Sequence, residues 1–182
     1  MRSTSILLAA AALALPTAAS AELATGAKAP GFTARGAIAG KVFSLSLATA
    51  LKRGPVVLYF YPKAFTQGCT LEANAFAEAS GEFRKAGASV IGMSNDDLPT
   101  LQRFSTEECR DKFAVASATP AIVKAYDVDL VRDGKSTGLT KRTSYVIGQD
   151  GRVRFVHSDM DYKDHVRLTL EAVRALKGKR KG

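Results

Sequence analysis

The 182-residue sequence contains no tryptophan, only two cysteines and only two histidines. His157 and His165 are too few, and too poorly supported by other ligand types, to predict a metal site. We therefore expect no metal, haem, flavin or other cofactor, and we expect both histidines to be partly exposed structural residues. Cys69 and Cys109 are 40 positions apart and form no Cys-x-x-Cys pair, which argues against a dithiol motif of the oxidoreductase type.

The chain also lacks an apolar run of the roughly 20 residues that a bilayer-spanning helix needs. A shorter run, Ile6–Leu15, follows Arg2 and is followed in turn by the small residues Ala19-Ser20-Ala21. This order is typical of a secretory signal peptide that is cleaved after Ala21. We predict a signal peptide over residues 1–21, a single domain over residues 22–182, a periplasmic or secreted location and no stable membrane insertion.

Acidic residues are scarce relative to basic ones, 17 against 26, so the net charge is +9. Part of the excess lies in the C-terminal segment Lys177-Gly-Lys-Arg-Lys181. A basic tail can bind nucleic acid or an anionic membrane surface. Because no aromatic residues alternate with these lysines as stacking platforms, we predict a solvated tail, no nucleic-acid partner and only a weak attraction to anionic membranes.

The rest of the sequence alternates strand and helix patterns. The β-branched and aromatic run Val56–Tyr61 predicts a central strand covered on both faces, and Ala88–Ser94 predicts a parallel neighbour. Around them we expect an N-terminal β-hairpin over Phe32–Leu45, helices over Thr70–Lys85, Leu98–Lys112, Thr119–Tyr126 and Tyr162–Leu176, a short segment at Phe113–Ala116, and a second hairpin joining Thr143–Ile147 to Val153–Val156. The pattern predicts an α/β sandwich with a central mixed sheet flanked by helices.

A cysteine stands just past the predicted central strand, in the segment Pro62-Lys-Ala-Phe-Thr66-Gln-Gly-Cys69. Helical spacing of apolar residues follows it, so Cys69 should lie in the loop or first turn that opens a helix. The unpaired N–H groups and the helix dipole at that point favour a thiolate over a thiol.

The pattern Pro62-x-x-x-Thr66-x-x-Cys69 resembles the active-site signature of the peroxiredoxins, the alkyl hydroperoxide reductase and thiol-specific antioxidant family. The longer string from Tyr59 to Glu72 is similar to the bacterioferritin-comigratory, or Q-type, branch. The likeness extends to Gly26-x-x-Ala29-Pro30-x-Phe32, to Val90–Ser94 and to Arg142-Thr-Ser-Tyr145, and so covers nearly all of the predicted mature chain. It implies a thioredoxin-like fold, a monomer, a hydroperoxide substrate and a thioredoxin-like or other dithiol reductant.

The resemblance also implies a role for each residue of the signature. Cys69 would attack hydrogen peroxide or an organic hydroperoxide and become a sulfenic acid, while Arg142 would supply a fixed positive charge. Thr66 would offer a hydroxyl to thiolate and peroxide, Pro62 would shield the sulfur, and Glu72 would hold Arg142. Two alternatives stay open, namely that Thr66 caps the helix and that Glu72 is a partner of the helix dipole.

The role of the second cysteine, Cys109, decides the mechanistic subtype of the predicted peroxidase. Asn74 stands where many members have a second cysteine, and the charged residues around Cys109 predict a reachable thiol. Some Q-type members place the resolving cysteine in this helix, which implies a Cys69–Cys109 disulfide that forms after partial unwinding. A permanent bridge, a one-cysteine peroxidase, a thiol-disulfide oxidoreductase and a redox-sensing binding module on the same fold are the alternatives.

Overall fold

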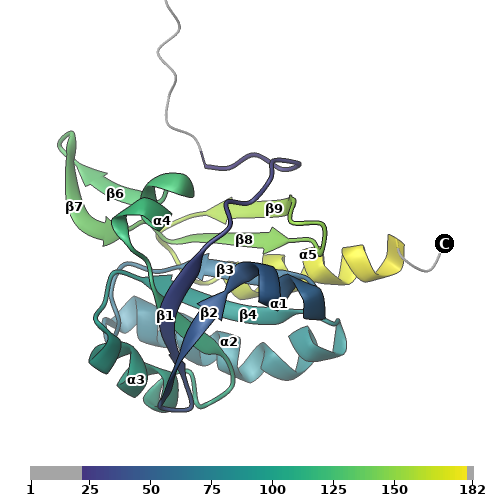
Figure 1. Ribbon diagram of the computed structural model, residues 1–182, viewed down its shortest axis with the longest axis horizontal. Helices are drawn as coiled ribbons and strands as arrows, with labels where there is room; N and C mark the ends of the chain where they lie inside the picture. Colours follow the sequence, from purple (N-terminus) through teal and green to yellow (C-terminus); the bar gives the residue numbers. More distant parts are fainter. Residues whose placement is uncertain (1–21, 180–182) are drawn as a thin grey trace, which may run out of the picture.

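The computed structural model describes residues 22–179, and the predicted signal peptide and the last three residues lie outside this range (Figure 1). A mixed seven-stranded sheet contains β1 (Thr33–Ile38), β2 (Lys41–Ser46), β3 (Val56–Phe60), β4 (Ser89–Ser94), β5 (Ala114–Ser117), β8 (Thr143–Ile147) and β9 (Val153–Ser158). The strand order is β2-β1-β5-β4-β3-β8-β9, in which β3, β4 and β5 are parallel and the other pairings are antiparallel. The α/β fold class with its N-terminal hairpin is confirmed.

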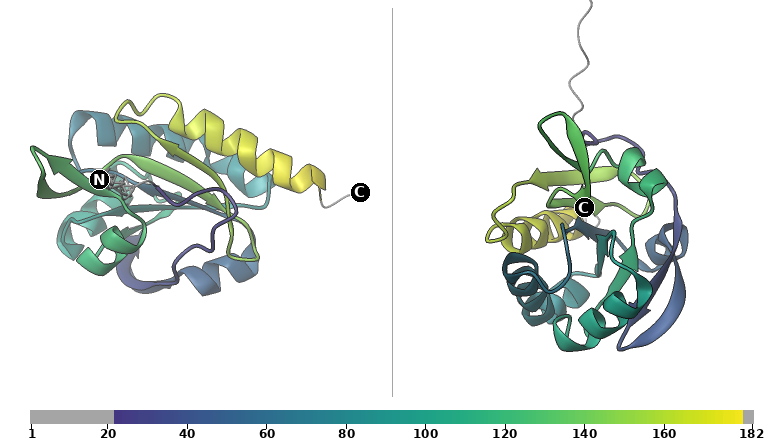
Figure 2. Two further views of the ribbon diagram at one scale, coloured as in Figure 1. Left: turned by 90° about the horizontal axis from the view of Figure 1, so that it is seen from above. Right: turned by 90° about the vertical axis from the view of Figure 1, so that its left-hand side faces the viewer.

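Helices cover both faces of this sheet. They are α1 (Leu47–Arg53), α2 (Gln67–Lys85), α3 (Leu98–Glu107), α4 (Pro120–Ala125) and α5 (His165–Lys179). Side chains of α2, α3 and α5 belong to one hydrophobic cluster, and those of α1 and α4 belong to the other. Figure 2 shows α5 and α2 side by side on one face of the sheet. The sheet is therefore sandwiched between two cores, as the apolar pattern predicts.

The central position of β3 follows from its sequence. All five residues of Val-Val-Leu-Tyr-Phe are completely buried, since β4 and β8 pair with its two edges while the two cores cover its faces. The prediction of a central strand is confirmed. Because the chain leaves the carboxyl end of β3 and turns directly into α2, the residues of this connection lie at the edge of the sheet where open α/β folds bind their ligands.

The buried face of α2 differs from the predicted one in its first turns. Leu71 is 43% exposed, whereas Glu72 is completely buried. A hydrophobic pattern alone would place these two residues the other way round. The helix turns Glu72 inward because an arginine meets it there, and Phe76 and Phe83 fill the same face farther along.

One helix and one hairpin were not foreseen, and several helix boundaries differ from the predicted ones. The short helix α1 was missed, as was the exposed two-stranded hairpin of β6 (Asp129–Arg132) and β7 (Lys135–Thr140), visible at the upper left of Figure 1. The predicted helix Leu98–Lys112 stops at Glu107, because Arg110 and Asp111 take positive φ angles of 49° and 58° that no helix can continue. The last helix begins at His165 rather than at Tyr162.

The predicted basic tail begins inside a helix. Helix α5 extends to Lys179, and Lys177 Nζ donates to the backbone oxygen of Lys85 at 2.7 Å, which ties the end of α5 to the end of α2. Arg180 and Lys181 lie outside the described residues. Within residues 22–179, no helix has the length and apolar character needed to cross a membrane, and no group of His, Cys, Asp and Glu side chains is arranged to hold a metal ion.

Candidate active site

Cys69 lies in the first turn of α2, at the carboxyl end of the central strand, as predicted. Its side chain is 2% exposed, and the helix dipole and the amide groups of this turn, which have no acceptor within the helix, face it. The loop before it is braced by Asp96, whose Oδ2 accepts from the Ala64 amide at 2.7 Å and from Ser94 Oγ at 2.8 Å. Asp97, in contrast, caps α3, where its Oδ1 accepts from the Thr100 amide at 2.9 Å.

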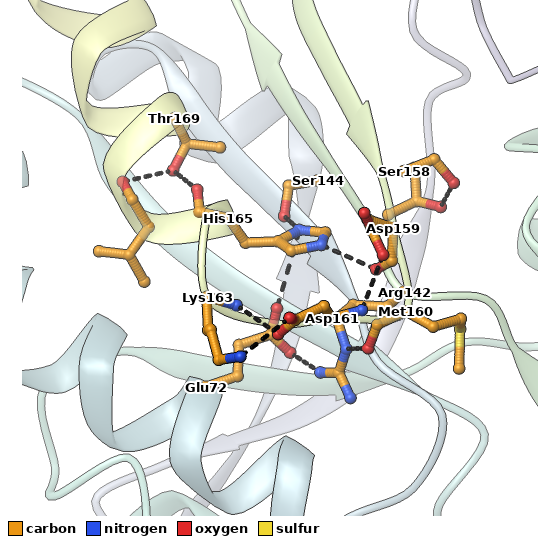
Figure 3. Close-up of polar contacts among 12 residues, drawn as sticks. Glu72, Arg142, Ser144, Ser158, Asp159, Met160, Asp161, Lys163, His165 and Thr169 are labelled. Atoms are coloured by element: carbon orange, nitrogen blue, oxygen red, sulfur yellow. Dashed lines mark hydrogen bonds and ion pairs between the residues drawn. The ribbon is translucent and has the colours of Figure 1, made fainter.

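Arg142 reaches this sulfur from the position just before β8. Its guanidinium is almost fully buried and donates through three nitrogens: Nη2 to Cys69 Sγ at 3.4 Å, Nη1 to Glu72 Oε2, and Nε to the Met160 carbonyl oxygen at 3.0 Å. Figure 3 shows the contacts of Arg142 with Glu72 and Met160. Gly68 leaves room for this approach, because a Cβ atom there would lie 3.3 Å from Arg142 Nη2. The structure therefore brings together three of the predicted residues, Cys69, Arg142 and Glu72.

Burial and charge act against each other in this cluster. Burial raises the pKa of Glu72 to about 8, although Arg142 opposes the rise. Burial alone would lower the pKa of Arg142, but the adjacent Glu72 carboxyl and Cys69 sulfur raise it above its ordinary value. A guanidinium that stays charged, beside a carboxyl that resists ionisation, directs its positive charge toward the sulfur.

Thr66 and Pro62 are near the cysteine in the chain but are not bonded to it. Thr66 precedes α2 as its N-cap residue, yet its side chain is exposed and donates to the Lys63 carbonyl oxygen at 2.9 Å. Side-chain capping of α2 by Thr66 is therefore absent, and no hydrogen bond of the described residues joins Thr66 to Cys69. Pro62 is half-buried in the loop between β3 and α2.

Cys109 differs from the expectation of a reachable thiol. It lies just past the end of α3, is completely buried, and belongs to the same hydrophobic cluster as Cys69. Both cysteines are free, so no bridge is present. Burial raises the pKa of Cys109, and the nearby Glu108 and Asp111 raise it further. The polar neighbours that suggested exposure point outward while the thiol points into the core.

One residue near the site was misjudged from the sequence. His165 is completely buried, not partly exposed, and its ring contacts Ser144, the Asp159 carbonyl and Glu72 (Figure 3). A signal for this existed, because His165, Thr169 and Val173 are spaced four apart and all three are buried in α5. His157 is half-buried, as expected.

The fold and the site define a thioredoxin-like α/β protein built around one buried cysteine that an arginine contacts. The AhpC/TSA family model matches residues 25–156. Peroxiredoxin Q of Oryza sativa subsp. japonica is 32% identical over 156 residues, which cover 85% of this chain and 69% of that protein. Peroxiredoxin Bcp of Escherichia coli (strain K12) is 31% identical over 63% of this chain and 75% of that protein.

A solved structure agrees with these relatives. The crystal structure of peroxidoxin BcpB from Mycobacterium tuberculosis superposes with a TM-score of 0.74 at 32% identity and covers 84% of this chain and 97% of that one. The chain therefore belongs to the AhpC/TSA family, with relatives in its peroxiredoxin Q and Bcp branch. It is a thiol peroxidase enzyme with a thioredoxin fold, which confirms the predicted family, fold and class of activity.

Proposed function

We propose that the protein reduces hydrogen peroxide and organic hydroperoxides through Cys69 and that Cys109 resolves the oxidised cysteine. The observation that carries the proposal is the 3.4 Å contact between Arg142 Nη2 and Cys69 Sγ in the first turn of α2. A thiolate held there attacks one peroxide oxygen, so that an S–O bond forms as the O–O bond breaks. The leaving oxygen takes a proton to become water or an alcohol, and Cys69 becomes a sulfenic acid.

Thr66 and Arg142 would have different roles in the attack on the peroxide. Because the Thr66 hydroxyl already donates to the Lys63 carbonyl, its oxygen can accept a hydrogen bond from the O–H of an incoming hydroperoxide. Arg142 and the free amides of the first turn of α2 supply donors where negative charge develops on the leaving oxygen. Pro62 has no N–H group, so it adds no competing donor to the loop.

In the second step the Cys109 sulfur attacks the sulfenic sulfur, a disulfide forms and water leaves. A thioredoxin-like or other dithiol protein would then reduce the disulfide by exchange and become oxidised itself. Cys109 must first leave the core, since it is completely buried and its thiol is held in the protonated form. The proposal therefore includes local opening of the turn that carries it.

That turn has two properties that favour opening. Arg110 and Asp111 are consecutive left-handed residues, each of which costs about 1 kcal/mol or more in a non-glycine residue. The turn is also held to α2 by exposed or half-buried polar contacts: Asn74 Nδ2 donates to Glu108 Oε2 at 2.8 Å, and Arg110 pairs with Glu78 at 3.2 Å. Contacts of this kind contribute little and break readily.

A one-cysteine mechanism is the second candidate, because Cys109 is buried and unbonded in the reduced protein. One experiment separates the two. Reduced protein is treated with one equivalent of hydrogen peroxide, and its cysteine peptides are analysed by mass spectrometry, alongside Cys69→Ser and Cys109→Ser. We expect a Cys69–Cys109 linked peptide in the wild type, no oxidation in Cys69→Ser, and a sulfenic acid that overoxidises in Cys109→Ser.

Two results of this experiment would contradict the proposal. Peroxide consumption by Cys69→Ser would exclude Cys69 as the nucleophile. Productive turnover with Cys109 still reduced would replace the resolving role with the one-cysteine mechanism. We further propose export through cleavage after Ala21, which the mass of the mature N-terminus in a periplasmic or secreted fraction would test, and a monomeric state, which sedimentation would test.

A further inference from the structure

His165 is a completely buried histidine with a single well-defined hydrogen-bonding pattern. Its Nε2 lies 2.9 Å from the Asp159 carbonyl oxygen, and its Nδ1 lies 2.8 Å from Ser144 Oγ. A carbonyl oxygen can only accept, so Nε2 carries the proton and donates it to this bond. Nδ1 then accepts from the Ser144 hydroxyl, and the imidazole is held as one neutral tautomer.

The segment that His165 contacts is the same segment that orients Arg142. The Asp159 amide donates to the Arg142 carbonyl oxygen at 3.2 Å, and Arg142 Nε donates to the Met160 carbonyl oxygen at 3.0 Å. Asp159 and Met160 are therefore held by the arginine on one side and by the histidine on the other (Figure 3). Ser144, on β8, ties the ring to the strand that Arg142 precedes.

Besides these bonds, the Asp161 amide donates to Asp159 Oδ1 at 2.8 Å and holds the turn that contains Asp159 and Met160. Asp159 and Met160 are exposed residues, the latter by 48%, so their side chains are not packed into the core. The bond from His165 therefore helps to fix the place of the Asp159–Met160 segment, and with it the acceptor that sets the direction of the guanidinium.

Burial and the positive groups beside the ring keep it neutral. Arg142 and His157 face it, the latter with a ring centroid 4.5 Å away, and Asp159 and Glu72 are the acidic groups beside it, with Glu72 Oε1 lying 3.8 Å from Nδ1. Burial lowers the pKa of His165 to about 4, and His157 and Arg142 contribute to the decrease. With the ring neutral, Arg142 is the charged group that contacts the sulfur.

We propose that His165 is a positioning residue for Arg142: its Nε2–H holds the Asp159–Met160 segment so that the guanidinium keeps its direction toward Cys69. This rests on the proposed function, in which Arg142 acts on the Cys69 thiolate and on the leaving oxygen. Displacement of a catalytic group by a fraction of an ångström is enough to slow a reaction by about 10-fold. His165 touches neither the sulfur nor the peroxide, so it acts only through Arg142.

The test compares three variants of the full-length reduced protein. His165→Leu keeps apolar bulk but has no donor, whereas His165→Gln places an amide N–H near the former Nε2 position. Val173→Ala is the matched control, because Val173 is buried in the same helix two turns away and has no polar group that could bond to the Asp159–Met160 segment. For each variant we measure the melting temperature, the pH midpoint of thiolate absorbance and the rate of oxidation by stoichiometric hydrogen peroxide.

His165→Leu should raise the pH midpoint of thiolate absorbance and slow oxidation by about 10-fold. In His165→Gln, the midpoint and the oxidation rate should both lie close to those of the wild type. Val173→Ala should lower the melting temperature while leaving midpoint and rate unchanged. The proposal is overturned if His165→Leu behaves as wild type, or if Val173→Ala shifts midpoint and rate to the same extent. If the wild type does not react with peroxide, the proposed function fails, but the midpoint still decides whether His165 positions Arg142.

Discussion

Replacement of Arg142 by methionine should have the largest effect on the reaction of any change that leaves Cys69 in place. Methionine retains an unbranched side chain but removes the charge and all three hydrogen bonds. At the observed 3.4 Å between Nη2 and Sγ, a unit charge pair is worth about 5 kcal/mol at an effective dielectric constant of about 20. Because Glu72 shares the guanidinium, we expect the substitution to remove about half of this attraction, about 2.5 kcal/mol, between Arg142 and a Cys69 thiolate.

The folded state should survive the substitution. Removing one partner of a buried ion pair normally costs about 3–5 kcal/mol, since the other charge is left in the core. Glu72 can avoid this penalty by taking up a proton, because burial already raises its pKa to about 8. The matched control is Arg154→Met, which removes an arginine from an exposed ion pair with Asp150.

The assay separates ionisation from transition-state stabilisation. Thiolate absorbance is followed against pH, and the rate of oxidation by hydrogen peroxide is measured by stopped flow at a pH above the midpoint of each variant. Arg142→Met should remain at least 10-fold slower there, because the donor to the leaving oxygen is lost as well. The reasoning is refuted if both the midpoint and the fully ionised rate match those of the wild type or of Arg154→Met.

Two further predictions concern Thr66 and His165. Thr66→Val should slow oxidation by about 10-fold or more with little change in the thiolate midpoint, since the hydroxyl bonds to Lys63 rather than to Cys69; a large shift of the midpoint would contradict this. The His165 pKa is about 4 in the folded state against 6.5 in the unfolded chain. Between these pH values the unfolded state binds more protons, so the stability that the neutral ring contributes above pH 6.5 is lost as the pH falls to about 4. This loss is at most about 3 kcal/mol of the free energy of unfolding. Chemical denaturation at several pH values should show that acid lowers the free energy of unfolding less for His165→Gln than for the wild type; an equal decrease in the two proteins would disprove this prediction.

The main architecture was predictable because its signals are local. The buried run at β3, the turn signal at Asp150-Gly151 and the apolar spacing in the long helices each depend on residues close together in the chain. The same is true of the position of Cys69 in the first turn of α2. The β6–β7 hairpin was missed because most of its residues are exposed, so its sequence carries no hydrophobic alternation.

The parts of the site that could not be predicted depend on contacts between distant residues. Glu72 is buried because Arg142, 70 positions away, provides its partner, and no local pattern reports that. Cys109 was expected to be reachable because its neighbours are charged, but the turn formed by Arg110 and Asp111 directs those charges outward and the thiol inward. The burial of His165 likewise follows from a donor on β8, the Ser144 hydroxyl, and from an acceptor before α5, the Asp159 carbonyl.

Loss of the negative charge on Cys69 should also weaken the contact that joins α2 to β8. When the sulfur becomes a neutral sulfenic acid, Arg142 keeps Glu72 and the Met160 carbonyl as acceptors but loses its attraction to the first turn of α2. One turn farther along, Asn74 bonds both to the Thr70 carbonyl and to Glu108, beside Cys109. Fraying of α2 from its first turn would therefore break the contact that holds the strained turn 108–111 closed. If Cys109 resolves the sulfenic acid, as proposed above, oxidation of Cys69 would lower the free-energy cost of exposing Cys109 for that attack.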